Sequence, residues 1–309
     1  MTIKNITEHI NNTPLIELKK IYKGKGHLYA KMEHIQPGGS VKDRVALQMI
    51  RDAYADGRLL KGMPVIEMTS GNMGAGLAVV CGAFGNPFTA VMSVGNSPER
   101  VKILKALGAD VILVPQISGE PGKVTGPDIA NAEEIAKDEV RKTNAFYADQ
   151  FNNPSSVKAH YSTTGPELFN ELGDRLNAFI AIIGTGGTFI GTSGYLKSKL
   201  KSVKCIAVEP KDAAIIKTGR VINPKHIIQG TSYGYVPPQW DDSLADDIIT
   251  VSDDEVSRTK ELLGKTEGLF VGFSSGANVV AAIKHLEQLD NDNSCVATIL
   301  CDTGFKYSM

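Results

Sequence analysis

The stretch Ala178-Phe-Ile-Ala-Ile-Ile-Gly-Thr-Gly-Gly-Thr188 joins an unbroken apolar run to a glycine-rich turn. Six consecutive apolar residues, 178–183, are typical of a strand that is buried on both faces of a parallel sheet. The apolar periodicity that follows, through Ile190, Tyr195 and Leu196, predicts a helix. Strand, turn and helix together indicate an α/β fold with an anion site at the helix start, where backbone N–H groups lack partners.

This turn favours a single phosphate monoester as its ligand. Two threonines add hydroxyl donors to the backbone N–H groups, so that the cradle comprises Gly184, Thr185, Gly186, Gly187 and Thr188. A dinucleotide site needs G-x-G-x-x-G, and Phe189 occupies the sixth position; the P-loop pattern is absent. A nicotinamide-dependent dehydrogenase stays as an alternative from another class, with Glu209 as the candidate ribose-binding acid.

A second glycine turn, Pro37-Gly-Gly-Ser-Val-Lys-Asp-Arg44, places a lysine where another helix begins. Ser40 is the predicted N-cap of this helix, which we expect over 41–56. Lys42 then lies at the positive end of the helix dipole, which disfavours its ammonium form and helps the amine to act as nucleophile or base. The alternative is a surface helix start whose charged residues 42–44 are solvated.

A third segment repeats the strand–turn–helix design. Residues 63–68 are expected to form a strand, 69–72 a turn and 73–84 a helix. The turn, Thr69-Ser-Gly-Asn72, carries two hydroxyls and an amide beside a helix N-terminus, which suits a carboxylate. An ordinary strand-to-helix turn with a capping residue is the alternative.

A lysine, a phosphate cradle and a carboxylate loop are what pyridoxal phosphate and an amino-acid substrate require. With these motifs the sequence resembles the fold type II pyridoxal-phosphate enzymes of the cysteine synthase and cystathionine β-synthase group. Six segments carry the resemblance in the family's order: 37–44, 69–72, Gln150-Phe-Asn-Asn-Pro154, Thr163-Thr-Gly-Pro-Glu167, 184–188 and Gln229-Gly230.

The resemblance implies roles for individual residues. Lys42 would carry the cofactor as a Schiff base and move the Cα proton, and Asn72 would contact the ring 3′-oxygen. Thr303 matches the family's hydroxyl facing the pyridine nitrogen, and strand alternation would turn the adjacent Asp302 the other way. The cradle 184–188 would complete the cofactor site. The substrate residues would be Thr69, Ser70, Gly71, Asn72, Met73, Gln150, Gly230, Ser232 and Tyr233.

The resemblance also implies a fold and an activity. We expect two doubly wound, three-layer α/β domains with mostly parallel sheets and the cofactor in the cleft between them. The larger, cofactor-phosphate-binding domain would comprise 1–42 and 153–309, and the smaller, mobile domain 43–152. The activity would be β-replacement on a serine- or cysteine-derived amino acid through an aminoacrylate. A homodimer and a serine acetyltransferase partner are further expectations.

The sequence predicts the substrate less specifically than it predicts the cofactor. O-acetylserine and sulfide, giving cysteine, are the favoured pair. Met73 replaces a threonine that is common in the family. The segment Thr231-Ser-Tyr-Gly-Tyr235 matches neither the pattern of the cysteine synthases nor that of the cystathionine β-synthases. Activities like those of a cystathionine β-synthase, an O-phosphoserine sulfhydrylase or a cysteine lyase therefore stay open, as does a non-catalytic binding module.

Composition agrees with an ordinary globular protein of 309 residues, 42% of them hydrophobic. The net charge of −1 gives no electrostatic footprint for nucleic acid or an acidic membrane. No apolar run has the length of a membrane span or signal peptide, which predicts a cytoplasmic protein. The histidines lack metal-ligand spacing, so no metal is expected, and the four cysteines are expected to be buried free thiols.

Strands and helices alternate along most of the chain. Further strands are expected near 27–33, 88–92, 110–115, 145–149, 178–183, 203–208, 246–251 and 294–301. Further helices are expected near 97–107, 128–142, 154–172, 188–200, 252–266 and 275–288. Two stretches rich in glycine and proline, 116–127 and 218–244, are expected to be long loops.

Overall fold

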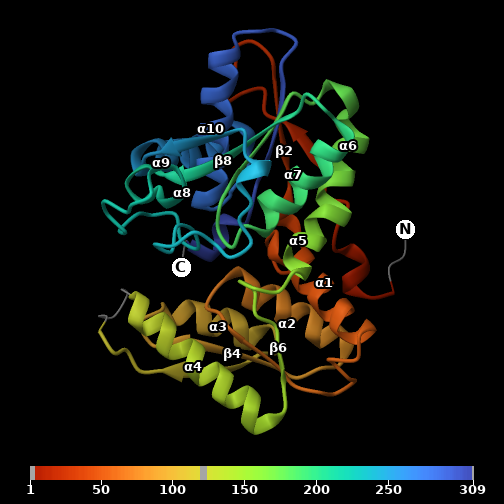
Figure 1. Cartoon of the computed structure of the whole chain (residues 1–309), viewed down its shortest axis with the longest axis vertical. Coiled ribbons are helices and arrows are strands. Elements are labelled where there is room, and N and C mark those ends of the chain that lie inside the picture. The colour runs from red at the N-terminus through yellow and green to blue at the C-terminus, as the bar shows by residue number, and fades with distance from the viewer. Residues whose placement is uncertain (1–3, 119–123, 308–309) are drawn as a thin grey trace. The chain divides into compact units, whose positions relative to one another are not determined.

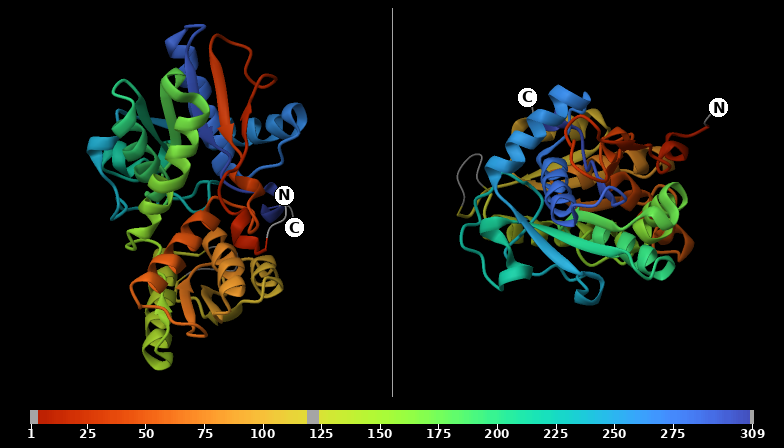
Figure 2. Two further views of the ribbon diagram at one scale, coloured as in Figure 1. Left: turned by 90° about the vertical axis from the view of Figure 1, so that its right-hand side faces the viewer. Right: turned by 90° about the horizontal axis from the view of Figure 1, so that it is seen from above.

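The computed structural model describes residues 4–118 and 124–307. Contacts divide the chain into two compact units, Met1–Ile10 with Gln36–Ser156, and Asn11–Ile35 with Val157–Met309. Each unit contains a mostly parallel sheet with helices packed against it (Figures 1 and 2). The predicted class, two α/β units with mostly parallel sheets, is confirmed.

The first unit is built on a four-stranded parallel sheet in the order β5-β4-β3-β6. Its core on one face joins strand side chains such as Ile66 and Val91 to Ala132 and Ala136 of α4. The other helices pack against one another and along the sheet. The elements are η1 (Ile6–His9), α1 (Lys42–Ala55), β3 (Val65–Met68), α2 (Asn72–Phe84), β4 (Phe88–Ser93), α3 (Pro98–Ala106), β5 (Asp110–Val114), α4 (Gly126–Thr143) and β6 (Phe146–Tyr147).

Strand order creates a switch point in this sheet. From β3 the chain moves outward to β4 and β5, and then returns to β6 on the other side of β3. The pairs Val65–Phe146 and Ile66–Tyr147 show that β3 and β6 are parallel and in register. Their carboxyl ends therefore adjoin, and ligands of open α/β sheets bind at such a point. The segments that leave it are 69–72 and 148–150.

The second unit contains a six-stranded sheet in the order β1-β2-β10-β7-β8-β9, in which only β1 is antiparallel. Helices α9 and α10 gather on one side of the sheet and α6 and α7 on the other (Figure 1). The strands are β1 (Leu15–Glu17), β2 (His27–Lys31), β7 (Ala178–Ile182), β8 (Lys204–Pro210), β9 (Asp247–Val251) and β10 (Cys295–Ile299). The longer helices are α6 (Gly165–Leu172), α7 (Gly187–Lys199), α9 (Asp253–Leu262) and α10 (Phe273–Leu289).

Short helical segments complete the chain. Helix α5 (Ser155–Ala159) spans the boundary of the two units. The others are η2 (Glu33–Ile35), η3 (His160–Thr164), η4 (Gly173–Arg175), η5 (Lys211–Ala213), α8 (Ile215–Thr218), η6 (Asp242–Leu244), η7 (Leu263–Glu267) and η8 (Gly304–Tyr307). Of these, η3 and η7 are single turns of π-helix.

The second sheet also has a switch point. Strand β7 is followed outward by β8 and β9, whereas β10 returns to the opposite side of β7 and pairs with it in parallel. The segments that leave the carboxyl ends of β7 and β10 begin at residues 183 and 300. They carry the glycine turn 184–188 and Thr303, so the topology brings the predicted phosphate cradle and the predicted ring partner to one sheet edge.

The contact-based units differ from the expected domain bounds in three segments. Residues 4–10, 36–42 and 153–156 group with the four-stranded sheet, whereas the expected bounds placed them in the larger domain. Lys42 is the first residue of α1, and α1 packs along α2, so the lysine belongs with the first unit. The mobility expected of residues 43–152 stays a prediction.

Most predicted elements are present within one to three residues. The antiparallel edge strand β1 and the one-turn helix α8 were missed, because segments of three and four residues carry no readable periodicity. The predicted helices 154–172 and 252–266 are each interrupted by a π-helical turn. In the predicted loop 116–127, residues 119–123 lie outside the described residues and α4 already begins at Gly126.

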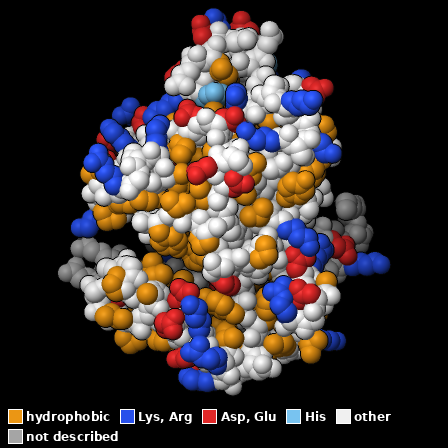
Figure 3. Space-filling view, viewed as in Figure 1, with side chains coloured by type: hydrophobic (Ala, Val, Ile, Leu, Met, Phe, Trp, Pro, Cys, Tyr) orange, Lys and Arg blue, Asp and Glu red, His pale blue; other side chains and the backbone are white. Residues whose placement is uncertain are grey.

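The surface carries both signs of charge. Figure 3 shows Lys and Arg side chains interspersed with Asp and Glu over the face that it draws. None of the helices within 4–118 and 124–307 combines the length and apolar character that a membrane span requires. All four cysteines are free, three of them buried and Cys301 half-buried.

Candidate active site

The anion cradle of the second unit forms between β7 and α7. Gly186 has a φ of 95°, a left-handed conformation that glycine adopts without strain, and α7 starts at the next residue. A Cβ on Gly184 would lie 2.7 Å from the carbonyl oxygen of Gly230, so a side chain cannot enter there without displacing backbone. The first N–H groups of α7 have no carbonyl partner within the helix. A closely packed glycine backbone and N–H groups that have no partner within the helix fit a phosphate.

Thr188, in the first turn of α7, is tied to a buried histidine. Its Oγ1 lies 3.2 Å from Nε2 of His160, and Nδ1 of His160 lies 2.9 Å from Oγ1 of Thr164. When Thr164 donates to Nδ1, Nε2 carries the proton and donates to Thr188, which leaves the Thr188 hydroxyl hydrogen for an anion. His160 lies in the π-helical turn η3. No pattern in the sequence distinguishes it from the other five histidines.

The segment after β10 separates Asp302 from Thr303. Asp302 is fully buried, accepts a hydrogen bond of 2.6 Å from the Tyr307 hydroxyl, and is fixed through its carbonyl by the N–H of Gly272. Thr303 is half-buried, pairs with Val271 and accepts from the N–H of Phe305 at 3.4 Å. Because the Thr303 oxygen accepts in this bond, the hydroxyl hydrogen can be donated to another acceptor. Because β10 ends at Ile299, an isolated bridge and not strand alternation sets Thr303 apart from Asp302.

The carboxylate loop of the first unit leaves β3 at the switch point. Oγ1 of Thr69 accepts from the N–H of Gly74 at 3.2 Å, so that its own hydrogen can reach a ligand. Gly71 occupies the N-cap position and Asn72 is the first residue of α2. Met73 is only 2% exposed, which agrees with an apolar wall in place of a hydroxyl donor.

Arg100 is a residue of this loop region that sequence reasoning missed. From the first turn of α3 its Nη1 donates to Oγ of Ser70 at 3.0 Å and to Oδ1 of Asn96 at 3.2 Å. A guanidinium group thus stands beside the predicted carboxylate loop. The signal was available, because a helix that follows β4 starts next to the end of β3 in a parallel sheet.

Lys42 opens α1, as the glycine turn predicted. Its N–H approaches Oγ of Ser40 at 3.3 Å, although Val41 occupies the N-cap position, one residue later than expected. Asp43 is fully buried and accepts from the N–H of Gly38, and Arg44 is 2% exposed. The alternative of a solvated helix start is therefore wrong.

Lys42 also lies beside the carboxylate-loop helix. A Cβ added to Gly76 of α2 would lie 3.1 Å from the Lys42 carbonyl oxygen. The first unit thus brings Lys42 close to the helix that begins at Asn72.

Gln150 and Glu67 meet at the carboxyl ends of β6 and β3. The Glu67 carboxyl group is 1% exposed and accepts from the backbone N–H groups of Asp149, at 2.7 Å, and of Gln150, at 3.2 Å. Burial raises the pKa of Glu67 to about 8, against the lowering effect of those two N–H groups. A charged residue inside the apolar strand Val65-Ile-Glu-Met68 was a readable signal that the sequence analysis did not use.

The segment after Gly230 shows two marks of a binding site. Ser232 has a φ of 48°, which is uncommon for a residue with a side chain, and its buried Oγ has no hydrogen-bond partner. Ser232 and Tyr233 line a narrow crevice together with Gly184 of the cradle. The predicted substrate residues Gly230, Ser232 and Tyr233 therefore lie next to the cradle.

Glu209 lines the same crevice but has another function. Its two carboxylate oxygens accept from the N–H groups of Ile216 and Lys217 at 3.0 and 2.9 Å, which caps α8. A carboxylate occupied in this way does not serve a ribose. The dinucleotide alternative is thereby weakened beyond the missing third glycine.

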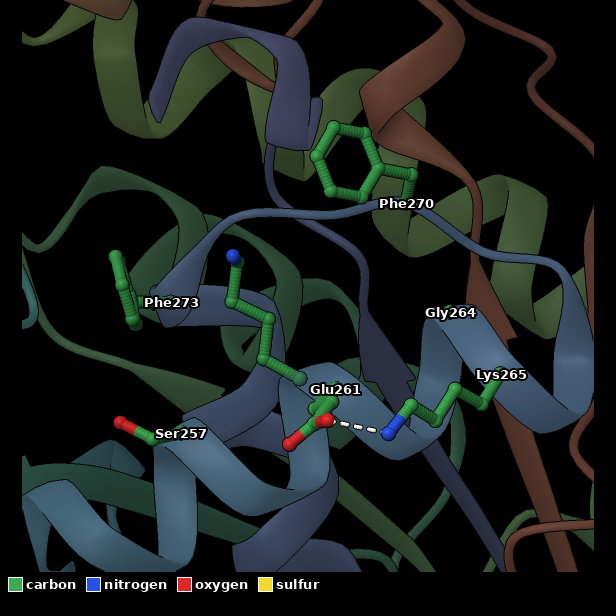
Figure 4. A pocket seen from close by; sticks show the side chains of 7 residues that line it. Ser257, Glu261, Gly264, Lys265, Phe270 and Phe273 are labelled. Atoms are coloured by element: carbon green, nitrogen blue, oxygen red, sulfur yellow. Dashed lines mark hydrogen bonds and ion pairs between the residues drawn. The ribbon is translucent and has the colours of Figure 1, made fainter. Parts of the chain in front are cut away.

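A cavity of about 370 Å³ lies within the six-stranded unit (Figure 4). It lies between α9, the π-helical turn η7 and the start of α10, with Phe270 and Phe273 on one side and the ion pair of Glu261 and Lys265 on the other. Lys260 stands 4.7 Å from the centre of the Phe273 ring. Within the described residues, no cluster of His, Cys, Asp and Glu could hold a metal ion.

Taken unit by unit, the predicted site residues group at the two switch points. The six-stranded unit carries the cradle, Thr303 and the segment 230–233; the four-stranded unit carries Lys42, the loop 69–73 and Gln150. A predicted phosphate cradle, a lysine at a helix start and a predicted carboxylate loop, on two mostly parallel sheets, match the class of fold type II pyridoxal-phosphate enzymes.

Comparison with known proteins gives the same class. The family described as pyridoxal-phosphate dependent enzyme matches residues 6–302. A probable cysteine synthase of Bacillus subtilis is 37% identical over 309 residues, which cover 99% of this chain and 96% of that protein. A hydrogen sulfide-producing enzyme from Fusobacterium nucleatum has a TM-score of 0.91 at 34% identity and covers 99% of this chain and 98% of its own.

An O-acetylserine dependent cystathionine β-synthase from Helicobacter pylori has a TM-score of 0.88 at 35% identity, with 100% of this chain and 98% of its own covered. The chain therefore belongs to the family of pyridoxal-phosphate dependent enzymes. It is an enzyme of the cysteine synthase type, whose cofactor is pyridoxal 5′-phosphate and whose reaction class is β-replacement.

Proposed function

We propose that the protein makes L-cysteine and acetate from O-acetyl-L-serine and hydrogen sulfide. The observation that carries the proposal is the Thr69–Asn72 loop at the β3–β6 switch point, where hydroxyl and amide groups suit one α-carboxylate. The resemblance to cysteine synthases over the whole chain supports it.

Each predicted residue has a role in this reaction. Lys42 holds the cofactor and moves the proton at the substrate Cα. Thr69, Ser70 and Gln150 would bind the α-carboxylate and so fix the orientation of the Cα–H bond, and Asn72 would contact the cofactor. The cradle would hold the cofactor phosphate, and the Thr303 hydroxyl would be a hydrogen-bond partner of the cofactor.

Pyridoxal phosphate, when bound, supplies the electron sink that lets the Cα proton and then the β-substituent leave. A hydroxyl is too weak an acid to keep the ring nitrogen protonated, whereas a carboxylate would do so. Thr303 in this position therefore favours direct expulsion of a leaving group from Cβ. The Ser232 hydroxyl and Tyr233 are the residues that we assign to substrate selection near the cradle.

The leaving group can be tested by comparing substrates. We expect kcat/KM for O-acetylserine to exceed that for O-phosphoserine by about tenfold or more, which corresponds to roughly 1.4 kcal/mol. The segment 231–235 offers only hydroxyls and glycine to a phosphate. An equal or reversed preference would refute acetate as the leaving group.

A second candidate is O-phosphoserine as the substrate. It is favoured by the guanidinium group of Arg100 beside Ser70, because an arginine is a strong partner for a phosphate. If this candidate holds, Arg100→Gln lowers kcat/KM for O-phosphoserine by a larger factor than for O-acetylserine. Equal factors for the two esters would exclude it.

We further propose that the protein is a cytoplasmic homodimer that binds a serine acetyltransferase. The resemblance to cysteine synthases supports both the homodimer and the complex with the acetyltransferase. Light scattering coupled to size-exclusion chromatography measures the mass of the enzyme alone and with the acetyltransferase. A monomeric mass would refute the dimer, and unchanged elution of the mixture would refute the complex.

A further inference from the structure

Glu67 occupies an unusual position for a carboxyl group. It is the third residue of β3, its neighbours Val65 and Ile66 are buried, and the residue itself is 1% exposed. Taking a carboxyl group out of water is costly unless hydrogen bonds compensate for the loss. Here they come from outside the strand, because the two oxygens accept from the consecutive N–H groups of Asp149 and Gln150 at 2.7 and 3.2 Å.

The turn that donates these bonds has a conformation that needs support. Asp149 has a φ of 51°, in the left-handed region that residues with side chains rarely adopt. Its carboxylate also accepts from Nδ2 of Asn152 at 2.9 and 3.1 Å, and its carbonyl accepts from the N–H of Asn153 at 2.9 Å. Such a turn persists only when its surroundings specify it.

The side chain of Gln150 is directed toward the neighbouring strand end. Its Nε2 lies 3.4 Å from the carbonyl oxygen of Met68, the last residue of β3, and the carboxylate loop begins at the next residue, Thr69. Glu67 therefore stands between the two segments that leave the switch point. It belongs to one strand and holds the backbone that follows the other.

We propose that Glu67 is the positioning residue of the substrate site: its carboxyl group fixes the Asp149–Gln150 peptide and so places the Gln150 amide beside the Thr69–Asn72 loop. The inference rests on the proposed function, in which Gln150 binds the substrate α-carboxylate. Glu67 itself touches no substrate and acts through Gln150.

The charged and titratable groups around Glu67 agree with this role. The Asp149 carboxylate raises the pKa of Glu67, and Tyr147 of β6 is a further neighbour whose own pKa is raised by burial and by Glu67. The contributions that lower the pKa of Glu67 come from hydrogen bonds of Asp149 and Gln150. The Glu67 carboxyl group and the Asp149–Gln150 turn thus stabilise each other through these hydrogen bonds.

The test uses Glu67→Gln, which keeps the shape and one carbonyl acceptor but turns an NH₂ group toward one of the two N–H groups. Glu67→Asp, which keeps the acid and is one methylene too short, serves as the second variant. Gln150→Ala and the double variant complete a cycle. Amide hydrogen exchange of residues 149 and 150 is measured without substrate, and kcat and KM are measured with O-acetylserine.

We expect exchange at 149 and 150 to accelerate at least tenfold in both Glu67 variants. We also expect KM to rise at least fivefold while kcat changes less than threefold. The double variant should be no worse than Gln150→Ala alone. Unchanged exchange, or losses that multiply in the double variant, would overturn the inference and leave the proposed function intact if Gln150→Ala still raises KM. A Gln150→Ala enzyme with unchanged KM would overturn both.

Discussion

Burial of Glu67 should make the stability of the protein fall as pH rises. The pKa is raised from 4.5 to about 8 in the folded protein, chiefly by burial. A group whose folded pKa exceeds its unfolded pKa contributes its full stability below the unfolded value, and this contribution is lost as pH rises through the folded value. The stability that the neutral Glu67 side chain contributes is therefore lost progressively between about pH 4.5 and pH 8.

The magnitude follows from the shift. One pKa unit corresponds to about 1.4 kcal/mol, so the shift of Glu67 corresponds to roughly 5 kcal/mol lost across this window. Glu67→Gln cannot ionise and loses this dependence. The free energy of unfolding of Glu67→Gln minus that of the wild type should therefore grow with pH, by about 1.4 kcal/mol per unit within the window.

Urea unfolding followed by circular dichroism at several values between about pH 5 and pH 8.5 measures this difference. Glu134→Gln is the matched control, because Glu134 on α4 is exposed, with 68% of its side chain accessible. Its pH dependence should follow the wild type. A difference between Glu67→Gln and the wild type that stays constant over the range would refute the reasoning, because the ionised carboxylate would then not be penalised by burial.

Three further predictions concern the cradle, the lysine and the core of the second unit. Gly184→Ala should weaken cofactor binding about tenfold or more in equilibrium dialysis, because its Cβ would lie 2.7 Å from the carbonyl oxygen of Gly230; Gly82→Ala, which meets open space, is the control, and equal affinities would contradict the close approach. Lys42→Ala should abolish turnover, and borohydride reduction with peptide mapping should label Lys42 in the wild type; a label on another lysine would exclude the assignment. Lys31→Met should lower the free energy of unfolding by about 3–5 kcal/mol, because the fully buried ammonium of Lys31 pairs with two α6 carboxylates at 3.0 Å; a urea midpoint equal to that of the wild type would show that the pairs contribute nothing net.

Local patterns were enough to predict most of the elements of the fold and the turns that leave β3 and β7. The apolar run 178–183 and the glycines after it predicted β7, the turn and α7, because each signal depends on neighbours in the chain. The helix start at Lys42 was predicted for the same reason. Its burial was not, since the exposure of Asp43 and Arg44 depends on what packs against α1.

Residues that act through long-range contacts escaped the sequence analysis. The bonds of Glu67 span about 82 positions and the Arg100–Ser70 bond spans 30. Such partners become neighbours only through the order of the strands, which hydrophobic periodicity does not encode. His160 escaped likewise, because 28 residues separate it from Thr188.

The strand orders explain why the predicted residues group as they do. In each unit the chain leaves a central strand in one direction and returns on the other side, at β3 and β6 in one sheet and at β7 and β10 in the other. At a switch point of a parallel sheet, the carboxyl ends of two neighbouring strands adjoin. No crossover connection covers the two loops that follow these strand ends. One loop at each point continues into a helix N-terminus, α2 or α7, which favours an anion. The other loop carries a predicted site residue, Gln150 at one point and Thr303 at the other. The same topology used twice thus offers two places that favour an anion, in agreement with the proposed carboxylate and phosphate sites for the two anionic groups that a pyridoxal-phosphate enzyme of amino acids must hold.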